Sequence, residues 1–463
     1  MEESERTVSG LEGKPDHLCV LVHGLWGNPT HLAYLASAVQ EKHSKEKLHV
    51  LVVARNSDYY TYDGIDIGAE RVAQEVEETV EEWTKTGHTI KKFSIVGYSL
   101  GGLIARYTIG LLYSRGFFNE ITPVNFTTFA SPHLGVRTPW RGFPSAVWNT
   151  LGGNTLSVSG RQLFLIDQFR DTGRPLLSVL ADPKSVFIEA LSHFKHRVLY
   201  ANITNDRSAP YYTTSISKVD PYVDLENLKI DYVKGYEPVI VALHQPRLST
   251  EQEVNGPIYT RIFYSVSTAW KDLPVYALWS LIIVIGPPVF LVNAGIQSWR
   301  SYQRIRLHEA GKMGIISGTY RIPLIAEQAR NAVEGAVRNV NAAAEPDYLN
   351  KDGGSTSQPD AQTEYLLVPG RSQKSEKTGG SPDETDLTDL TDSETTTKVP
   401  TLALTQEQFE MIEALDNVGW RKFPVYIHKV RHSHAAIIVR KQKENFFEGK
   451  IVVKHWLEEA FEI

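Results

Sequence analysis

Short apolar runs and longer amphipathic stretches alternate along the first half of the chain. The apolar runs favour strands, and they are Leu18–Val22, Val50–Ala54, Phe93–Val96, Val124–Phe129 and Val198–Ile203. Between two of them, Val72, Val76 and Val80 recur at a spacing of four residues, which predicts an amphipathic helix over Ala69–Trp83. Strands that alternate with helices predict an α/β fold, a mostly parallel sheet flanked by helices.

Later segments depart from this alternation and divide the chain. Residues 274–299 are dominated by an apolar run, and 300–345 have a helical pattern with several arginines near the start. Residues 346–400 are rich in Gly, Ser, Thr, Asp and Pro, and Ser381–Thr397 carries six acidic side chains and no basic one. We therefore expect a core at 1–273, an apolar membrane anchor at 274–299, a helical juxtamembrane segment at 300–345, a disordered acidic linker at 346–400 and a return to the core at 401–463.

The last part of the chain again has the pattern of a folded region. Thr405 and Gln408 have the spacing of a capping box, which predicts a helix that begins there and continues to about Leu415. Phe423–Val430 is a predicted strand.

Composition narrows the classes of function. The chain has 463 residues and a net charge of −6, which argues against a nucleic-acid partner, since such proteins carry basic patches. Its one cysteine, Cys19, excludes an intrachain disulfide and favours a reducing compartment. The first six residues are acidic and no apolar signal region follows, so we expect a protein that is not secreted.

Ser99 lies in the stretch G-Y-S-L-G-G, between a predicted strand and a predicted helix that contains Leu103–Tyr107. This context predicts a nucleophile elbow, in which flanking glycines leave room for a sharp reversal and expose the serine hydroxyl. The helix N-terminus beside it favours a developing negative charge. Ser99 is therefore the candidate nucleophile.

The first predicted strand leads directly into His23-Gly24-Leu25, the H-G pattern of lipases and esterases. Backbone N–H groups of Leu25 and Leu100 are the candidate oxyanion hole. We interpret His23 as a brace for this loop rather than as the catalytic base.

The acid of a hydrolase triad follows the serine in the chain, and the base comes last. Asp206 directly follows the strand that ends near Ile203, where a carboxylate is well placed to orient an imidazole. Asp220 and Asp224 are the fallback candidates.

The chain has fifteen histidines that could serve as the base. His434 is the candidate because it follows the predicted strand at 423–430 and small residues come after it, and His432 is the alternative. His133 precedes Asp206 in the chain, and we interpret it as structural.

Seven stretches together resemble the fungal lipid droplet phospholipases of the putative serine esterase family, within the α/β-hydrolases. They are V-L-V-H-G-L-W-G (20–27), Y-T-Y-D-G-I-D (60–66), G-A-E-R (68–71), S-I-V-G-Y-S-L-G-G-L-I-A-R-Y (94–107), F-A-S-P-H-L-G (129–135), N-D-R-S-A-P-Y-Y (205–212) and V-R-H-S-H-A-A-I-I-V-R (430–440). The resemblance covers about residues 16–225 and 400–440, and its last motif is the most distinctive.

The resemblance implies Ser99 as nucleophile, Asp206 as acid and His434 as base. It also implies hydrolysis of acyl esters of glycerophospholipids at the surface of a lipid droplet, with lipid as the substrate. We expect no metal or cofactor, because the H-S-H pair at 432–434 lacks a carboxylate or cysteine partner at ligand spacing and serine hydrolysis requires no metal. Two other readings remain open. One is an acyltransferase or thioesterase with the same triad, and the other is a catalytically silent membrane tether with a hydrolase fold.

The apolar run Pro274–Ile296 bears on localisation. Its 23 uncharged residues would make a helix of about 34 Å, enough to cross a bilayer core of about 30 Å. A single crossing would place Ser99 and His434 on opposite sides of the membrane, and Pro287-Pro288 breaks a straight helix in the middle. We therefore expect a monotopic hairpin or in-plane anchor that keeps the site on the cytosolic side; a buried core helix is the alternative.

Overall fold

The computed structural model describes residues 15–43, 47–137, 153, 155–223, 225, 228–242, 292–311 and 402–463, and the short strands at 247–248, 365–367 and 396–398. Trp140, Phe143 and Trp148, considered as part of a cap over an acyl pocket, lie outside the described residues, as do Asp224 and the apolar residues 274–291.

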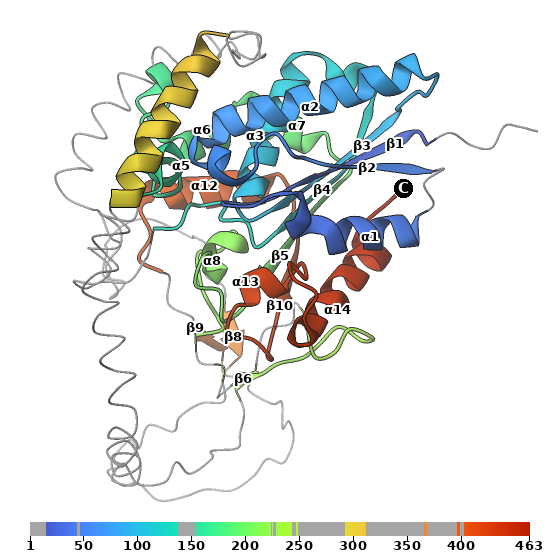
Figure 1. Cartoon of the computed structure of the whole chain (residues 1–463). Helices are drawn as coiled ribbons and strands as arrows, with labels where there is room; N and C mark the ends of the chain where they lie inside the picture. The colour runs from blue at the N-terminus through green and yellow to red at the C-terminus, as the bar shows by residue number, and fades with distance from the viewer. Residues whose placement is uncertain are drawn as a thin grey trace, which may run out of the picture.

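A six-stranded sheet runs through the middle of the molecule (Figure 1). In spatial order its strands are β10 (Arg421–Val425), β5 (His196–Asn202), β4 (Thr122–Phe129), β3 (Lys92–Tyr98), β1 (His17–Val22) and β2 (Leu48–Val52). Every neighbouring pair is parallel. The carboxyl ends of all six strands therefore meet at one edge, where open α/β sheets bind their ligands. The predicted α/β architecture is confirmed.

Helices cover both faces of this sheet, as a parallel sheet requires. They are α1 (Ala33–Lys42), α2 (Ile65–Lys85), α3 (Leu100–Ser114), α5 (Ser157–Leu163), α6 (Leu176–Leu180), α7 (Val186–Ser192), α8 (Tyr211–Thr214), α12 (Gln406–Asn417), α13 (Ser433–Ala436) and α14 (Phe447–His455). Single turns are η1 (Pro29–Leu32), η2 (Asp58–Tyr62), η3 (Phe117–Asn119), η4 (Arg170–Thr172), η6 (Glu444–Phe446) and the π-turn η7 (Trp456–Ala460). Helices α2, α3, α6, α7 and α12 lie on one face, and α1 and α14 on the other (Figure 1).

The alternation of side chains along β1 explains the two cores. Leu18 and Val20 belong to the core under α2 and α3, whereas Cys19 and Leu21 belong to the core under α1 and α14. All four are fully buried. The run is continuously apolar because both of its faces are covered.

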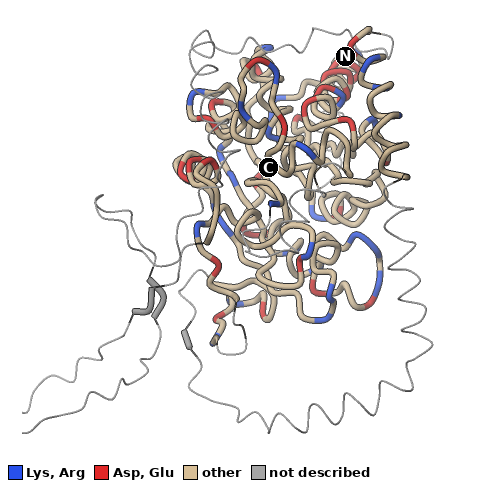
Figure 2. The backbone as a smooth tube through the Cα atoms, turned by 90° about the vertical axis from the view of Figure 1, so that its left-hand side faces the viewer, with Lys and Arg blue, Asp and Glu red and all other residues tan. Residues whose placement is uncertain are grey.

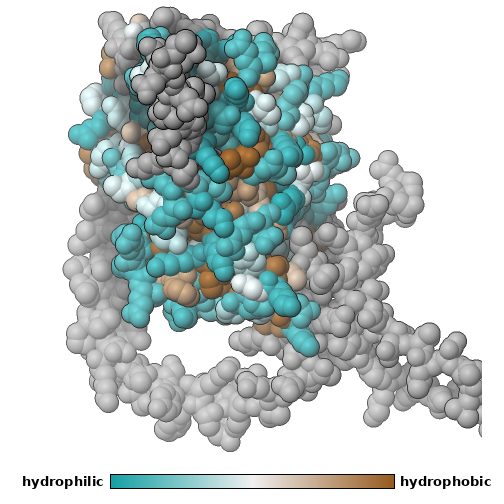
Figure 3. All heavy atoms as spheres, turned by 90° about the vertical axis from the view of Figure 1, so that its right-hand side faces the viewer, coloured by the Kyte–Doolittle hydropathy of each residue, from teal (hydrophilic) through white to brown (hydrophobic). Residues whose placement is uncertain are grey.

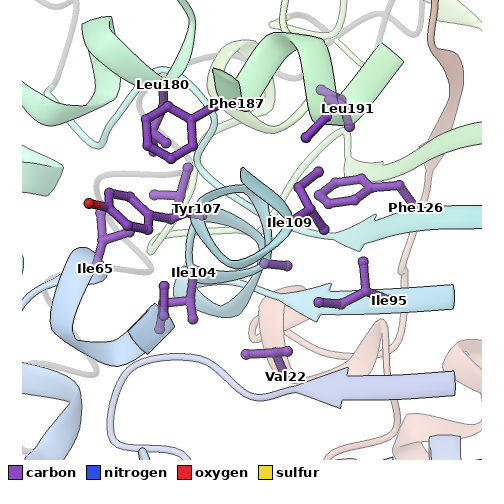
Figure 4. Packing of buried hydrophobic residues seen from close by; sticks show 14 of the residues in the cluster. Val22, Ile65, Ile95, Ile104, Tyr107, Ile109, Phe126, Leu180, Phe187 and Leu191 are labelled. Atoms are coloured by element: carbon purple, nitrogen blue, oxygen red, sulfur yellow. The ribbon is translucent and has the colours of Figure 1, made fainter. Parts of the chain in front are cut away.

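Helix α3, which begins immediately after Ser99, lies at the centre of the larger core (Figure 4). Every residue from Leu100 to Leu112 is buried. The ring of Tyr107 faces Phe187 of α7 with 4.7 Å between ring centroids, and the sheet side is lined by Ile95 and Phe126. This packing on all sides holds the start of the helix in place.

The segment after residue 402 completes the sheet that the first half of the chain begins. Helix α12 starts at the predicted capping box, since Thr405 Oγ1 accepts from Gln408 N–H at 3.3 Å and Gln408 Oε1 accepts from Thr405 N–H at 3.1 Å. Strand β10 pairs with β5, so that Val425 lies opposite Asn202.

The predicted strand Phe423–Val430 is wrong in its length, because β10 ends at Val425. Its neighbour β5 ends at Asn202, and beyond this point the N–H of Tyr426 donates to the carbonyl of Val239 at 2.8 Å. The N–H groups of His428 and Lys429 donate instead to the buried carboxylate of Glu448, each at 2.9 Å. The apolar pattern therefore continues past the point at which pairing with β5 ends.

Two segments of the predicted linker and anchor regions are described. Within 346–400, expected to be disordered, β8 (Tyr365–Leu367) pairs antiparallel with β9 (Thr396–Lys398), where aromatic, aliphatic and β-branched residues interrupt the polar composition. Outside these two regions, within the predicted core at 1–273, a second short pair joins β6 (Leu228–Lys229) to β7 (Arg247–Leu248). A helix over 292–309, yellow in Figure 1, spans the predicted boundary at 299/300.

No helix in the described part of the chain is both long enough and apolar enough to cross a membrane.

Charged positions of both signs are spread over the described backbone, with no single basic stripe (Figure 2). On the side of the molecule opposite helix 292–309, the hydrophobic side chains form small separate patches among hydrophilic ones (Figure 3).

Candidate active site

The structure brings Ser99, His434 and Asp206 together at the carboxyl edge of the sheet. Ser99 follows β3, Asp206 follows β5, and His434 lies in α13, which follows β10. His434 Nε2 is 2.9 Å from Ser99 Oγ, and His434 Nδ1 is 2.8 Å from Asp206 Oδ2. Residues that lie up to 335 positions apart in the sequence thus form one continuous chain of hydrogen bonds.

The turn at Ser99 has the strained backbone of a nucleophile elbow. Ser99 has φ 56° and ψ −128°, a conformation that an L-residue holds only when its surroundings enforce it. A Cβ at Gly97 would stand 2.3 Å from the Cα of Gly102, and one at Gly101 would stand 2.2 Å from the carbonyl oxygen of Val22. These two glycines therefore permit the close approach of β1, β3 and α3 that exposes the serine.

The carboxylate of Asp206 is almost fully buried, with 2% of its side chain exposed. It accepts from Asn202 Nδ2 at 2.9 Å and, through its other oxygen, from the N–H groups of Ser208 at 3.0 Å and Ala209 at 2.9 Å. With the contact to His434, four donors satisfy this buried group. Asp206 is consequently held in one orientation toward the imidazole.

Two hydrogen bonds fix the segment that carries His434. Ser433 Oγ donates to the carbonyl of Thr204 at 2.8 Å, next to the Asp206 loop. The hydroxyl of Tyr98 donates to the carbonyl of His434, and the two rings lie 5.2 Å apart. Burial raises the pKa of Tyr98, whereas the guanidinium of Arg440 beside it acts in the opposite direction. Tyr98 is thus a neutral donor at neutral pH.

The loop that carries Leu25 packs directly against the elbow. A Cβ at Gly24 would stand 2.7 Å from the Cβ of Ser99, so only glycine allows this approach. Leu100 is the first residue of α3, and its N–H has no carbonyl one turn earlier in the helix to which it could donate. The two predicted oxyanion donors thus belong to the elbow and to the loop packed on it.

The geometry agrees with the comparison to known protein families. Residues 12–218 match the family described as putative serine esterase (DUF676). Over this range, a little under half of the chain, the protein is similar to the putative serine esterase family.

Relatives in yeasts are named putative lipases. The chain is 33% identical over 221 residues to the putative lipase ROG1 of Saccharomyces cerevisiae, which covers 47% of this chain and 31% of that protein. It is 30% identical over 214 residues to the putative lipase C4A8.10 of Schizosaccharomyces pombe, covering 45% of this chain and 27% of that protein. The chain thus spans less than a third of the length of these curated relatives.

Solved structures that resemble part of the chain include RedJ with a PEG molecule bound in its active site, at 24% identity and a TM-score of 0.21 over 32% of this chain and 60% of that one. A Trichoderma reesei cutinase in complex with a phosphonate inhibitor matches at 16% identity and a TM-score of 0.19 over 27% of this chain and 55% of that one.

The range that matches the putative serine esterase family contains Ser99 and Asp206 but ends before His434. In the structure the C-terminal segment supplies the histidine to this family region through β10 and α13. The two parts therefore form one site.

Three other histidines considered for the site do not reach Ser99. His23 is buried against its own loop, with Nε2 3.4 Å from Ser57 Oγ, and burial lowers its pKa. His133 is buried with Nε2 3.0 Å from Thr128 Oγ1, and burial and the nearby Arg106 lower its pKa well below the usual value. The side chain of His432 is exposed, and its residue forms the N-cap of α13.

Asp220 lies outside this arrangement, since its Oδ1 accepts from the N–H of Tyr222 at 3.0 Å in a turn, and burial raises its pKa to about 6.

Sequence reasoning missed two residues that support the site. Asn202 donates to Asp206, and Tyr98 donates to the His434 carbonyl. Asn202 is the last residue but one of the predicted strand Val198–Ile203, near the strand end where polar side chains reach the active edge of a sheet, and this signal was available in the sequence. The partner of Tyr98 lies 336 positions away, and no local pattern indicates it.

The arrangement has the parts needed to activate an alcohol. His434 is placed to take the proton of Ser99, and Asp206 to stabilise the resulting imidazolium. Among the described residues, no group of three or more His, Cys, Asp and Glu side chains is arranged to hold a metal ion.

Proposed function

We propose that the protein is a serine carboxyl-ester hydrolase that acts on lipids. The observation that carries the proposal is the unbroken chain of hydrogen bonds from Ser99 Oγ through His434 to Asp206. The match of residues 12–218 to the putative serine esterase family supports the same reaction.

In the proposed reaction, Ser99 Oγ attacks the ester carbonyl while His434 Nε2 takes its proton. Asp206 Oδ2 accepts the Nδ1–H of His434, which fixes the tautomer in which Nε2 is a base. The N–H groups of Leu25 and Leu100 hold the oxyanion of the tetrahedral intermediate. His434 then gives its proton to the leaving alcohol, and the same residue activates water to hydrolyse the acyl-enzyme.

Labelling with a fluorophosphonate probe tests this proposal directly, because the probe forms a covalent bond only with an activated serine. We expect the wild-type protein to be labelled and the Ser99→Ala variant to remain unlabelled. The matched control is Ser208→Ala, which removes a hydroxyl beside the site but keeps the Ser208 N–H that donates to Asp206. A wild-type protein that is folded but not labelled would instead indicate the silent tether.

For the substrate, we propose glycerophospholipids. Arg431 and Lys441 are exposed on either side of α13, and Arg440 lies close enough to Tyr98 to influence its pKa. These cations flank the segment that carries His434, where they are suited to a lipid with a phosphate group. Neutral acylglycerols present no such charge.

The lipid itself can be identified by profiling products. An emulsion of triolein coated with phosphatidylcholine offers both classes of ester to the purified protein. We expect fatty acid and lysophosphatidylcholine, with the triolein largely intact, and a several-fold slower reaction for Arg431→Gln combined with Lys441→Gln. Release of fatty acid from triolein alone would indicate an acylglycerol lipase.

We further propose that the protein works at the surface of a lipid droplet, to which helix 292–309 contributes. Val292, Ile296 and Trp299 recur along one side of this helix, and all three are exposed, Trp299 at 63%. The apolar run 274–291 directly precedes this exposed stripe in the sequence, and Arg300 and Arg306 are exposed beside it. An apolar stripe flanked by arginines is typical of a helix that lies in a lipid–water interface.

Binding to protein-free droplets separates attachment from catalysis. Trp299→Ser should lower the bound fraction, while Phe447→Ser serves as the control, because Phe447 is also exposed, at 53%, but belongs to α14 on the other face of the sheet. Equal binding of both variants and the wild type would contradict a role for the helix.

A further inference from the structure

Asp63 is a fully buried carboxylate that joins three separate segments of the chain. Its side chain has 0% exposure and pairs with Arg71 of α2, at 2.7 Å, and with Arg304 of helix 292–309, at 2.7 Å. Ser301 Oγ donates to the same carboxylate at 2.6 Å. Buried charges persist only when they are paired in this way, so Asp63 is a fixed point between the helix and the core.

A second polar contact holds the same helix one turn later. His308 Nε2 lies 2.6 Å from Glu70 Oε2, and both side chains are largely buried. The inner side of helix 292–309 is therefore polar, with Gln297, Ser301 and His308 nearly inaccessible, while its outer side exposes apolar residues. Specific charge pairs, rather than general hydrophobic burial, fix the position of this helix.

The arginines that bind Asp63 also bind the backbone of η2. Arg304 Nη2 donates to the carbonyl of Tyr59 at 2.9 Å, and Arg71 Nη1 donates to the carbonyl of Tyr60 at 3.2 Å. Arg304 thus binds both the carboxylate of Asp63, which directly follows η2, and the backbone of η2 itself.

Two hydrogen bonds join η2 to the loop that carries Leu25. The N–H of Trp26 donates to Thr61 Oγ1 at 3.0 Å, and the N–H of Asp58 donates to the carbonyl of Gly27 at 2.7 Å. These two bonds hold Trp26 and Gly27, the two residues that follow Leu25 in the loop. A contiguous set of hydrogen bonds therefore runs from helix 292–309, through Asp63 and η2, to the loop packed on Ser99.

We propose that Arg304 is a positioning residue for the reaction, which acts through Asp63 and η2 to hold the Leu25 N–H in the oxyanion hole. This inference rests on the proposed esterase function. It gives helix 292–309 a second role beside contact with lipid, because the same helix that meets the lipid on its outer side sets the oxyanion loop from its inner side.

Arg304→Gln tests the inference without removing the whole cluster, since Asp63 keeps Arg71 as its partner. We expect kcat for a soluble ester, p-nitrophenyl butyrate, to fall between about 10-fold and 100-fold with little change in KM, the scale of a displacement of about 1 Å. Arg304→Lys restores one charge contact but not the planar fork that reaches both Asp63 and Tyr59, and should recover part of kcat. Glu309→Gln, at an exposed position of the same helix, is the matched control and should behave as the wild type.

Hydrogen exchange followed by mass spectrometry reports on the loop independently of activity. Arg304→Gln should accelerate exchange in residues 23–28 and 57–62, and Glu309→Gln should not. Unchanged exchange at 23–28, or an unchanged kcat in an active wild-type background, would overturn the positioning role. A wild-type protein with no esterase activity would contradict the proposed function, and the exchange of the two variants would still decide whether Arg304 holds the loop.

Discussion

Tyr98 donates its hydroxyl proton to the backbone carbonyl of His434 at 2.9 Å, although 336 positions separate the two residues in the sequence. Tyr98 is the last residue of β3 and directly precedes Ser99. The strand that ends at the proposed nucleophile therefore also holds the segment that carries the proposed base. This contact fixes the distance between the two reacting groups.

Replacing Tyr98 by phenylalanine should weaken catalysis more than it weakens the fold. The aromatic ring can keep its contact with His434, but the carbonyl loses its donor, which costs about 1 kcal/mol of stability. We expect kcat to fall by less than the about 100-fold that a displacement of about 1 Å costs. Thermal melting and kinetics with a soluble ester measure both effects. An unchanged kcat beside a lowered melting temperature would restrict Tyr98 to a structural role.

The proposed triad residues should behave as one unit when they are removed. Ser99→Ala and His434→Ala are each expected to lower turnover by several orders of magnitude, and the double variant should lose little more. His432→Ala is the matched control, because its side chain is exposed two positions away. A dead His432→Ala variant and a nearly normal His434→Ala variant would reverse the assignment of the base.

Asp206→Asn should preserve the fold of the loop but impair the base. The amide oxygen can still accept from Ser208 and Ala209, whereas the negative charge that stabilises the imidazolium is lost. In serine hydrolases this change costs about 10⁴-fold in kcat. Asp220→Asn provides the comparison, since Asp220 also accepts from a turn amide but does not contact His434. Equal activity of the two variants would argue against Asp206 as the acid.

The free energy of unfolding should fall as the pH decreases from about 6.5 toward 4. Burial lowers the pKa of both His17 and His455 from 6.5 to about 4. In this pH range the unfolded chain binds protons that the folded protein does not, so acid favours unfolding, whereas above pH 6.5 both states are neutral. The expected loss is on the order of 1–3 kcal/mol for each group.

Thermal melting at a series of pH values measures this dependence. His455→Gln should flatten the curve, and His432→Gln, at an exposed position, should leave its slope unchanged. A melting temperature that stays constant between pH 6.5 and 4.5 would contradict the prediction.

Much of residues 350–398 should be dispensable. Their composition is too poor in apolar side chains to offset the entropy of ordering, so a short Gly/Ser replacement is expected to leave esterase activity intact. A deletion that extends into α12 should abolish it, because Gln408 donates to the carbonyl of Leu134 at 3.0 Å inside the core. A folded but inactive replacement would count against a role as a linker.

The strands could be predicted because their physical cause is local. The apolar runs predicted for β1 to β5 match these strands to within about two residues at each end, since each run is bounded by polar or turn-forming residues. The extension of β10 to Val430 failed, because strand length depends on which neighbour offers backbone partners. The capping box at Thr405 was readable because both of its hydrogen bonds lie within four residues.

Chain order and family motifs allowed the residues of the proposed triad to be predicted, although not the distances between them. The contacts of Asp63 could not be predicted from the sequence. Its partner Arg304 lies 241 positions later, and a charge in a stretch of sequence does not indicate which distant charge it will meet. Of the apolar segment 274–299, the structure describes residues 292–299, and the expected hairpin stays a prediction.

The pairing of β10 with β5 has a consequence for the order in which the protein is made. A ribosome completes the elbow at Ser99 and the loop at Asp206 more than 200 residues before it reaches His434. Until β10 and α13 have emerged and added themselves to the edge of the sheet, the serine has no base. A growing chain that lacks α13 therefore has no histidine beside Ser99, and the proposed reaction becomes possible only after this segment has been translated.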